Sequence, residues 1–215
     1  NYSADRGWLS GIQTTRGATT VQNLGYGRDA KGRITQITSP FAGEGWSTLV
    51  YDDLDRLTSA SSSTSAVYNQ SWSYDVLGNL TYNSRVGAYS YALPGKPHAV
   101  SSAGGNSYTY DAAGNQLSGA GRTMTWNGAG QLAQVVAGPS LISLFYTPFG
   151  DRLKAVEGGT TTWYAGPDVV WPIGNAPITK YVRLAGRIIG KKEGWQTSTP
   201  YWIHADHHGS INVVT

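Results

Sequence analysis

The chain lacks several residue types on which common folds depend. It contains no cysteine, one methionine and three glutamates among 215 residues. Without cysteine, neither a disulfide framework nor a thiolate zinc site can form. Charged residues make up 13% of the sequence, which is about half the usual share. Because Glu, Lys and Met stabilise helices, their shortage excludes a helical bundle and a coiled coil.

Long apolar runs are also missing. The longest, such as Val169–Ile173, are far too short to span a membrane. The opening residues, Asn1–Ile12, have no basic region followed by an apolar stretch, so we expect no signal peptide within these residues.

The charge balance is weakly basic, with a formal net charge of +3 and a pI of about 9.1. This bias is too small to predict a nucleic-acid partner. The local basic cluster is interpreted as a solvated strand face, with a phosphate or acidic-glycan patch as the alternative. Its residues are Lys180, Arg183, Arg187, Lys191 and Lys192.

Small polar and aromatic residues take the place of the missing types. The chain has 28 Gly, 14 Tyr and 8 Trp, together with many Ser and Thr. So many aromatic residues argue against general disorder, because their burial is favourable. The composition predicts an all-β chain with many turns.

A short pattern recurs along the chain: an aromatic residue, Asp or Asn, two variable residues, Gly, a polar residue and then Leu or Ile. The clearest copy is Tyr74–Thr81. The copy at Tyr51 carries Asp55 in place of the Gly. The other copies are Arg28–Thr35, Tyr51–Thr58, Tyr110–Asn115, Trp126–Leu132 and Tyr146–Leu153, with a frayed copy at Asp5–Leu9.

Each copy has the chemistry of a β-hairpin turn. The Asp carboxylate can accept hydrogen bonds from backbone N–H groups two residues on. The Gly supplies the positive φ that short hairpin loops require, as we expect for Gly78 and Gly114. The residues expected to define the hairpins are Asp29, Gly32, Tyr51, Asp52, Tyr74, Asp75, Gly78, Tyr110, Asp111, Gly114, Trp126 and Asn127.

The spacing also predicts strand register. With Asp75 opposite Asn79, Tyr74 faces Leu80 and Trp72 faces Tyr82. The copy at Tyr110 has one extra residue, Gln116, before its Leu. We therefore expect a β-bulge in that copy.

These copies resemble the tyrosine-aspartate (YD) repeats of the rearrangement-hotspot (Rhs) family over nearly the whole chain. Tyr201–Thr215 is similar to the Asp-His-Leu-Gly-Ser stretch of the family's repeat-associated core, with His208 in place of Leu. The resemblance implies antiparallel hairpins in a spiralling sheet that is part of a hollow β-shell. It assigns 1–160 to the YD repeats and 161–215 to part of the core.

In bacterial members of the family, the shell encloses a variable C-terminal toxin. The resemblance thus implies a non-enzymatic wall segment of a secreted or exported bacterial protein, acting in bacterial competition. Its expected partners are the rest of the polypeptide and the toxin. The family's self-cleavage motif, Asp-Pro-x-Gly-Leu, does not occur here. Because the chain opens inside a repeat, we expect it to be a segment of a longer polypeptide with edge strands prone to self-association.

Two other functions are kept as alternatives. The first is a cell-surface carbohydrate-binding or adhesion module that uses the aromatic stripes and the basic cluster. The second is an enzyme or metal site near the C-terminus. On a strand, His204, Asp206 and His208 would share a face and could hold a divalent ion. The preferred interpretation includes no catalytic residue, cofactor or metal.

Overall fold

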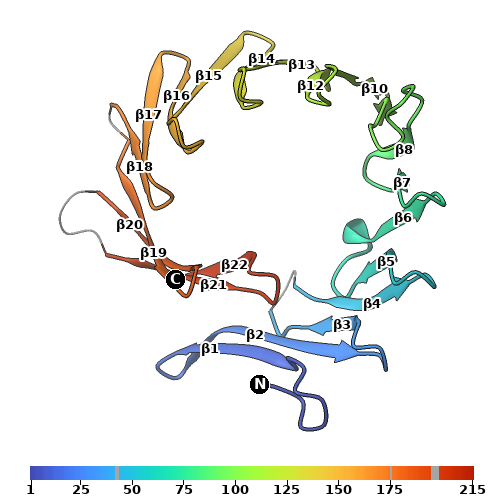
Figure 1. Cartoon of the computed structure of the whole chain (residues 1–215). Helices are drawn as coiled ribbons and strands as arrows, with labels where there is room; N and C mark the ends of the chain where they lie inside the picture. Colours follow the sequence, from blue (N-terminus) through green and yellow to red (C-terminus); the bar gives the residue numbers. More distant parts are fainter. Residues whose placement is uncertain (42–43, 175, 195–198) are drawn as a thin grey trace. The chain divides into compact units, whose positions relative to one another are not determined.

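The computed structural model describes residues 1–41, 44–174, 176–194 and 199–215. Over these residues short strands follow one another, and the helical structure among them is one 3-10 turn, η1 (Ala66–Tyr68). Strand order within each sheet is sequence order (Figure 1), and the paired strands run antiparallel. The predicted all-β, antiparallel class is confirmed. Within the described residues, no helix is long and apolar enough to cross a membrane.

Contacts divide the chain into two compact units. The first comprises Asn1–Tyr89 with Ile203–Thr215, and the second comprises Ser90–Trp202. The expected division of 1–160 from 161–215 follows sequence pattern, not contacts, and stays a prediction.

The first unit is a meander to which the C-terminal residues are added. Its strands are β1 (Gly11–Arg16), β2 (Thr19–Arg28), β3 (Ile34–Thr38), β4 (Trp46–Tyr51), β5 (Leu57–Ser62), β6 (Gln70–Tyr74), β7 (Leu80–Asn83), β8 (Gly87–Ser90) and β22 (Ile211–Val214). Strand β21 (Tyr201–Ala205) enters it at Ile203.

The second unit is also a meander. Its strands are β9 (Ser102–Ala103), β10 (Asn106–Ser107), β11 (Thr109–Tyr110), β12 (Gln116–Gly119), β13 (Arg122–Trp126), β14 (Leu132–Ala137), β15 (Ser140–Tyr146), β16 (Arg152–Glu157), β17 (Thr160–Ala165), β18 (Val169–Pro172), β19 (Thr179–Leu184) and β20 (Arg187–Glu193).

Burial is sparse in both units. The buried hydrophobic residues of the described chain are mostly isolated along the sequence: Leu24, Tyr26, Ala60, Ala103, Ile178 and Ile203. The chain exposes 13449 Å², whereas a compact monomer of this mass exposes about 9,600 Å². Because so few side chains are buried, local hydrogen bonds must supply much of the stability of the sheet.

The repeated pattern forms one kind of five-residue turn. In each described copy, the N–H of the first residue donates to the carbonyl of the fifth at 2.8–3.1 Å. The N–H of the fourth donates to the carbonyl of the first at 3.0–3.2 Å. The fourth residue has φ between 63° and 96°, which favours Gly and is tolerated by Asp55. The turns are 29–33, 52–56, 75–79, 111–115, 127–131, 147–151 and 206–210.

A β-bulge follows every one of these turns, so one register prediction was wrong. Tyr74 pairs with Leu80 as expected, but Ser73 pairs with Tyr82 and Trp72 with Asn83. The extra residue that shifts the register is Thr81. A bulge sets two residues against one and moves later side chains by one position.

The bulge expected at the Tyr110 copy is present, but it is not special to that copy. Tyr110 pairs with Gln116 and Thr109 with Ser118, so Leu117 is the extra residue. Gln116 takes the place that Leu or Ile holds in most other copies, and Arg152 takes it in the Tyr146 copy. The frayed first copy also differs from expectation, because Ser3 and not Asp5 caps its turn through the N–H of Trp8 (3.0 Å).

The turn geometry makes a prediction at Gly78, which has φ 86° and no atom near the position of an added Cβ. Gly78→Val is expected to destabilise the protein by more than about 1 kcal/mol, because a β-branched residue fits positive φ poorly. Gly78→Asn is the matched control and is expected to cost less, because Asn tolerates this φ. Equal melting temperatures for the two variants would contradict the assignment.

Candidate functional site

In five of the seven turns an Asp at the first position holds the turn closed with its carboxylate, whereas Asn127 and Thr147 use an amide or hydroxyl oxygen in the other two. Asp75 Oδ1 accepts the backbone N–H groups of Leu77 (2.9 Å) and Asn79 (2.8 Å). Asp75 Oδ2 accepts the side-chain amide of Asn79 at 2.9 Å. The same set recurs between Asp111 and Asn115. The predicted capping role of these aspartates is therefore seen directly.

In the two preceding turns an arginine replaces the amide. Arg33 Nε lies 2.6 Å from Asp29 Oδ2, and Arg56 Nε lies 2.7 Å from Asp52 Oδ2. The backbone N–H of Arg56 is the main cause that lowers the pKa of Asp52, and its guanidinium adds to the effect. A carboxyl whose pKa is lowered by folding stabilises the folded state above about pH 4 and loses that effect as the pH falls further.

Aromatic residues link four of the turns to the one before. The phenol of Tyr51 donates to the carbonyl of Ile34 at 2.7 Å, and that of Tyr74 to Leu57 at 2.9 Å. In both cases the acceptor is the residue that follows the preceding turn. Further links of this kind run from Trp126 Nε1 to Gln116 (2.8 Å) and from Tyr146 to Leu132 (2.9 Å). Tyr110 donates to the carbonyl of Val100 (3.0 Å), which follows no turn of this kind.

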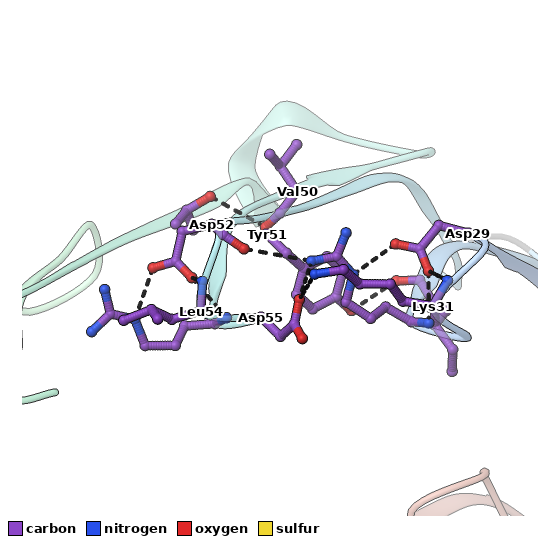
Figure 2. A network of polar contacts seen from close by, with 11 residues as sticks. Asp29, Lys31, Val50, Tyr51, Asp52, Leu54 and Asp55 are labelled. Atoms are coloured by element: carbon purple, nitrogen blue, oxygen red, sulfur yellow. Dashed lines mark hydrogen bonds and ion pairs between the residues drawn. The ribbon is translucent and has the colours of Figure 1, made fainter.

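Cationic side chains add a second link between turns. Figure 2 shows the Asp29 turn beside the Asp52 turn, where Asp55 Oδ1 accepts Arg33 (2.6 Å) and Lys31 (2.9 Å). The guanidinium of Arg33 also lies 4.9 Å from the Tyr51 ring centroid. Arg56 repeats this arrangement, with its guanidinium 4.6 Å from the Tyr74 ring and 3.2 Å from the Asp75 carbonyl. Tyr51 and Tyr74 are therefore each held both at the hydroxyl and at the ring face.

The C-terminal histidine cluster is a further turn of the same kind. Asp206 Oδ1 accepts the backbone N–H groups of His208 and Ser210, both at 2.9 Å. His204 Nε2 lies 3.0 Å from Thr215 Oγ1. Strand β21 ends at Ala205, so His204, Asp206 and His208 do not lie on one strand as expected. Across the described chain, no group of three acidic or histidine side chains could hold a metal ion.

This C-terminal turn packs against β2 within the first unit. Gln22, which is 1% exposed, donates to the Ala205 carbonyl (3.2 Å) and to Asn212 Oδ1 (2.9 Å). The rings of Tyr26 and His207 meet edge to face, with centroids 4.8 Å apart. No sequence pattern predicted this contact between residues about 180 positions apart.

The packing buries two polar atoms without a hydrogen-bond partner among the described residues, Tyr26 Oη and His207 Nδ1. Burial lowers the pKa of His207, and the adjacent His208 lowers it further. Burial also raises the pKa of Tyr26. Both shifts favour the neutral forms that the contact requires.

Comparisons with known proteins were made at three levels. No protein-family model and no curated protein matches the sequence. Solved structures do match. A Tc holotoxin pore of Photorhabdus luminescens, a TccC3 D651A mutant, superposes with a TM-score of 0.74 at 18% identity, over 100% of this chain and 13% of that one. A TcdB2-TccC3-TEV structure has a TM-score of 0.69 at 18% identity, over 98% of this chain and 13% of that one.

A third structure, TcdB2-TccC3 without its hypervariable C-terminal region, has a TM-score of 0.67 at 16% identity, over 100% of this chain and 14% of that one. The chain has an Rhs-like fold. It spans only about an eighth of the length of these proteins. At identities below 20%, the similarity to these structures shows the fold of the chain alone. Its activity and its partners are proposals.

The hydrogen bond from Tyr74 to the preceding turn can be tested by mutation. Tyr74→Phe is expected to destabilise the protein by about 1 kcal/mol, because the Leu57 carbonyl loses its phenol donor. Tyr82→Phe is the control, because Tyr82 is exposed on the neighbouring strand. Urea unfolding measures both. A Tyr74→Phe midpoint equal to that of the control would contradict the role of the phenol.

The docked C-terminal turn makes a prediction about pH. The pKa of His207 is lower in the folded state than in the unfolded state. The packing of the C-terminal turn on β2 is therefore fully stable above about pH 6.5 and loses stability as the pH falls below that value. Arg28 and His208 oppose protonation, while Asp206 favours it. Glu44 and Arg85 line the adjoining cavity of about 280 Å³. His207→Phe keeps a ring against Tyr26 and removes the titration.

The melting temperature of His207→Phe is expected to rise relative to wild type between pH 7.5 and pH 5.5. His208→Gln, in the exposed neighbouring position, is the control and is expected to keep most of the wild-type pH dependence. Identical pH profiles for wild type and His207→Phe would show that this histidine does not govern the docking.

Proposed function

We propose that this chain is a wall segment of a larger Rhs-type β-shell that encloses a C-terminal toxin or effector. The observation that carries the proposal is the superposition of essentially the whole chain on about an eighth of much longer toxin-complex proteins. The role is mechanical and requires no catalytic group.

The physical character of the sheet supports this role. The exposed surface exceeds that of a compact monomer by thousands of Å², as expected for a sheet that other chain segments complete. The turns close through their own residues and the preceding turn, so a wall of this kind can be extended by adding hairpins. Such additive construction is typical of repeat proteins. We further propose that the complete protein is bacterial and exported.

Enclosure is tested on the polypeptide that carries this segment and its C-terminal region. Under native conditions, the C-terminal region is expected to survive a protease that degrades it after unfolding. Digestion of that region while the β-sheet stays intact would contradict enclosure.

For the chain by itself, we propose that copies associate through the unpaired edge strands of the sheet. Strand β22 pairs with β21 alone among the described strands, and Val214 on it is 44% exposed. Unpaired N–H and C=O groups on such an edge invite another strand. The purified chain is therefore expected to grow in mass with concentration in light scattering.

Val214→Lys is expected to reduce this association, because a charge on an edge strand opposes pairing. Val50→Lys is the matched control. Val50 is 45% exposed but lies on β4, which is paired on both sides. A monodisperse monomer of about 23 kDa at every concentration would contradict the wall-segment proposal.

A second candidate function is carbohydrate binding. One specific observation favours it: aromatic side chains lie exposed on adjacent strands of the second unit, including Trp163 and Trp171, which pair directly. Flat exposed rings in a row are a surface on which sugar rings can stack.

A further inference from the structure

The turn at 127–131 is chemically unlike the five turns that begin with Asp. Its first residue is Asn127, and Gly128 follows it, which makes this the one Asn-Gly pair in the sequence. Asparagine is a thermally labile residue, because the backbone nitrogen of the next residue can attack its side-chain amide. A glycine in that next position hinders the attack least, since it carries no Cβ. Both residues are exposed, so water reaches the amide.

The turn brings the two reacting groups together. Asn127 Oδ1 accepts the N–H of Ala129, two residues on, at 3.0 Å. This bond folds the side chain back along the Gly128 peptide, whose nitrogen would be the attacking atom. The N–H of Gly128 donates no hydrogen bond within the described part of the chain, and an added Cβ on Gly128 would meet no atom within 4 Å. The nitrogen is therefore free to approach the amide carbon.

The same turn holds the amide oxygen between two backbone donors. Besides Ala129, the N–H of Gln131 donates to Asn127 Oδ1 at 2.9 Å. Attack on the amide carbon would turn this oxygen into an oxyanion, and donors that are already in place stabilise such a charge without reorganisation. The turn thus supplies both the close approach and the polarised carbonyl that cyclisation needs.

We propose that Asn127 is a self-modification site at which the folded turn promotes deamidation. The Gly128 nitrogen bonds to Asn127 Cγ and gives up its proton to solvent, the Cγ–Nδ2 bond breaks, and Nδ2 takes up a proton and leaves as ammonia. The product is a cyclic succinimide. Water then adds to either carbonyl carbon of the ring and opens it to aspartate or to isoaspartate. No group is oxidised or reduced, and water is the only co-reactant.

The two products affect the turn differently. Aspartate at position 127 keeps both bonds at Oδ1, and the Gln131 side chain, which accepts Asn127 Nδ2 at 2.9 Å, can turn its NH2 group toward the new oxygen. That is the arrangement of Asp75 with Asn79. Isoaspartate adds a methylene group to the main chain and displaces the carboxylate, so it breaks the closure next to Trp126. The reaction therefore either converts this turn to the common Asp type or opens it.

Asn83 provides an internal control. Its Oδ1 accepts the N–H of Arg85, again two residues on, at 2.8 Å. The intervening nitrogen, however, belongs to Ser84, which carries a Cβ and donates its N–H to the Ser71 carbonyl at 3.0 Å. We therefore expect Asn83 to stay intact in the folded chain while Asn127 reacts.

The test incubates the purified wild-type chain at pH 8, folded in buffer and unfolded in guanidinium chloride, and follows its peptides by mass spectrometry. Asn127 is expected to gain the mass of an amide-to-acid conversion, at least as fast in the folded chain as in the unfolded one. Isoaspartate is counted separately by enzymatic methylation of its carboxylate. The folded chain is expected to show no conversion of Asn83 over the same period.

Matched variants separate the attacking nitrogen from the rest of the turn. Gly128→Val is expected to slow the reaction at Asn127 more than about tenfold, because a β-branched side chain crowds that nitrogen. Ala129→Val, at the next exposed position of the turn, is the control and is expected to leave the rate nearly unchanged. Asn127→Asp reproduces the first product and is expected to melt no lower than wild type.

Several results would overturn the inference. Slower reaction of Asn127 in the folded chain than in the unfolded chain would show that the turn protects the amide. Equal conversion of Asn83, or a Gly128→Val chain that reacts as fast as wild type, would refute the role of the Gly128 nitrogen. A lower melting temperature for Asn127→Asp would refute conversion to the Asp type of turn. These outcomes do not bear on the shell or on carbohydrate binding, because the chemistry is confined to one turn.

Discussion

The structure depends on one local interaction, the closure of a five-residue turn by a side-chain oxygen at its first position, which is a carboxylate in five of the seven turns. A carboxylate that accepts two backbone N–H groups satisfies donors that the hairpin leaves open, and it does so without tertiary support. Asp75 and Asp111 make this closure with the amide of the fifth residue, while Asp29 and Asp52 make it with an arginine. Each turn sets the pairing of the two strands that it joins. Repeating the turn along the chain therefore adds one hairpin after another to the sheet.

In four of the turns, the aromatic residue before the first position connects the turn to the preceding one. Its polar end donates to a carbonyl next to the preceding bulge, as Tyr74 does to Leu57. The bulge interrupts the regular strand pairing at this point, and the aromatic donor makes use of a carbonyl beside it. Each hairpin is then stabilised by contacts with the adjacent hairpins, as in other repeat proteins. A sheet held in this way can remain thin and widely exposed.

The turns could be predicted from the sequence because their information is local. Asp, Gly and the aromatic residue lie within five positions, and each acts on its own backbone neighbourhood. Register was harder: Thr81 and Leu117 are bulge residues with no distinctive side chain, so only the structure shows that every turn carries the same bulge. The docking of His207 on Tyr26 could not be predicted, because it joins residues about 180 positions apart and uses side chains outside the repeat pattern. The histidine cluster suggested a metal site by composition, whereas its Asp206 serves the same turn closure as the other aspartates.

Native-state hydrogen exchange of the wild-type protein tests the central claim most directly. If turn closure organises the sheet, the fifth-position amides that donate to the carboxylate, such as those of Arg56, Asn79 and Asn115, will be among the slowest to exchange. Their protection will be comparable to that of strand amides beside the buried Leu24 and Ala60. The account is contradicted if these turn amides exchange at nearly the rate of an unfolded chain while protection is confined to the few buried strand positions.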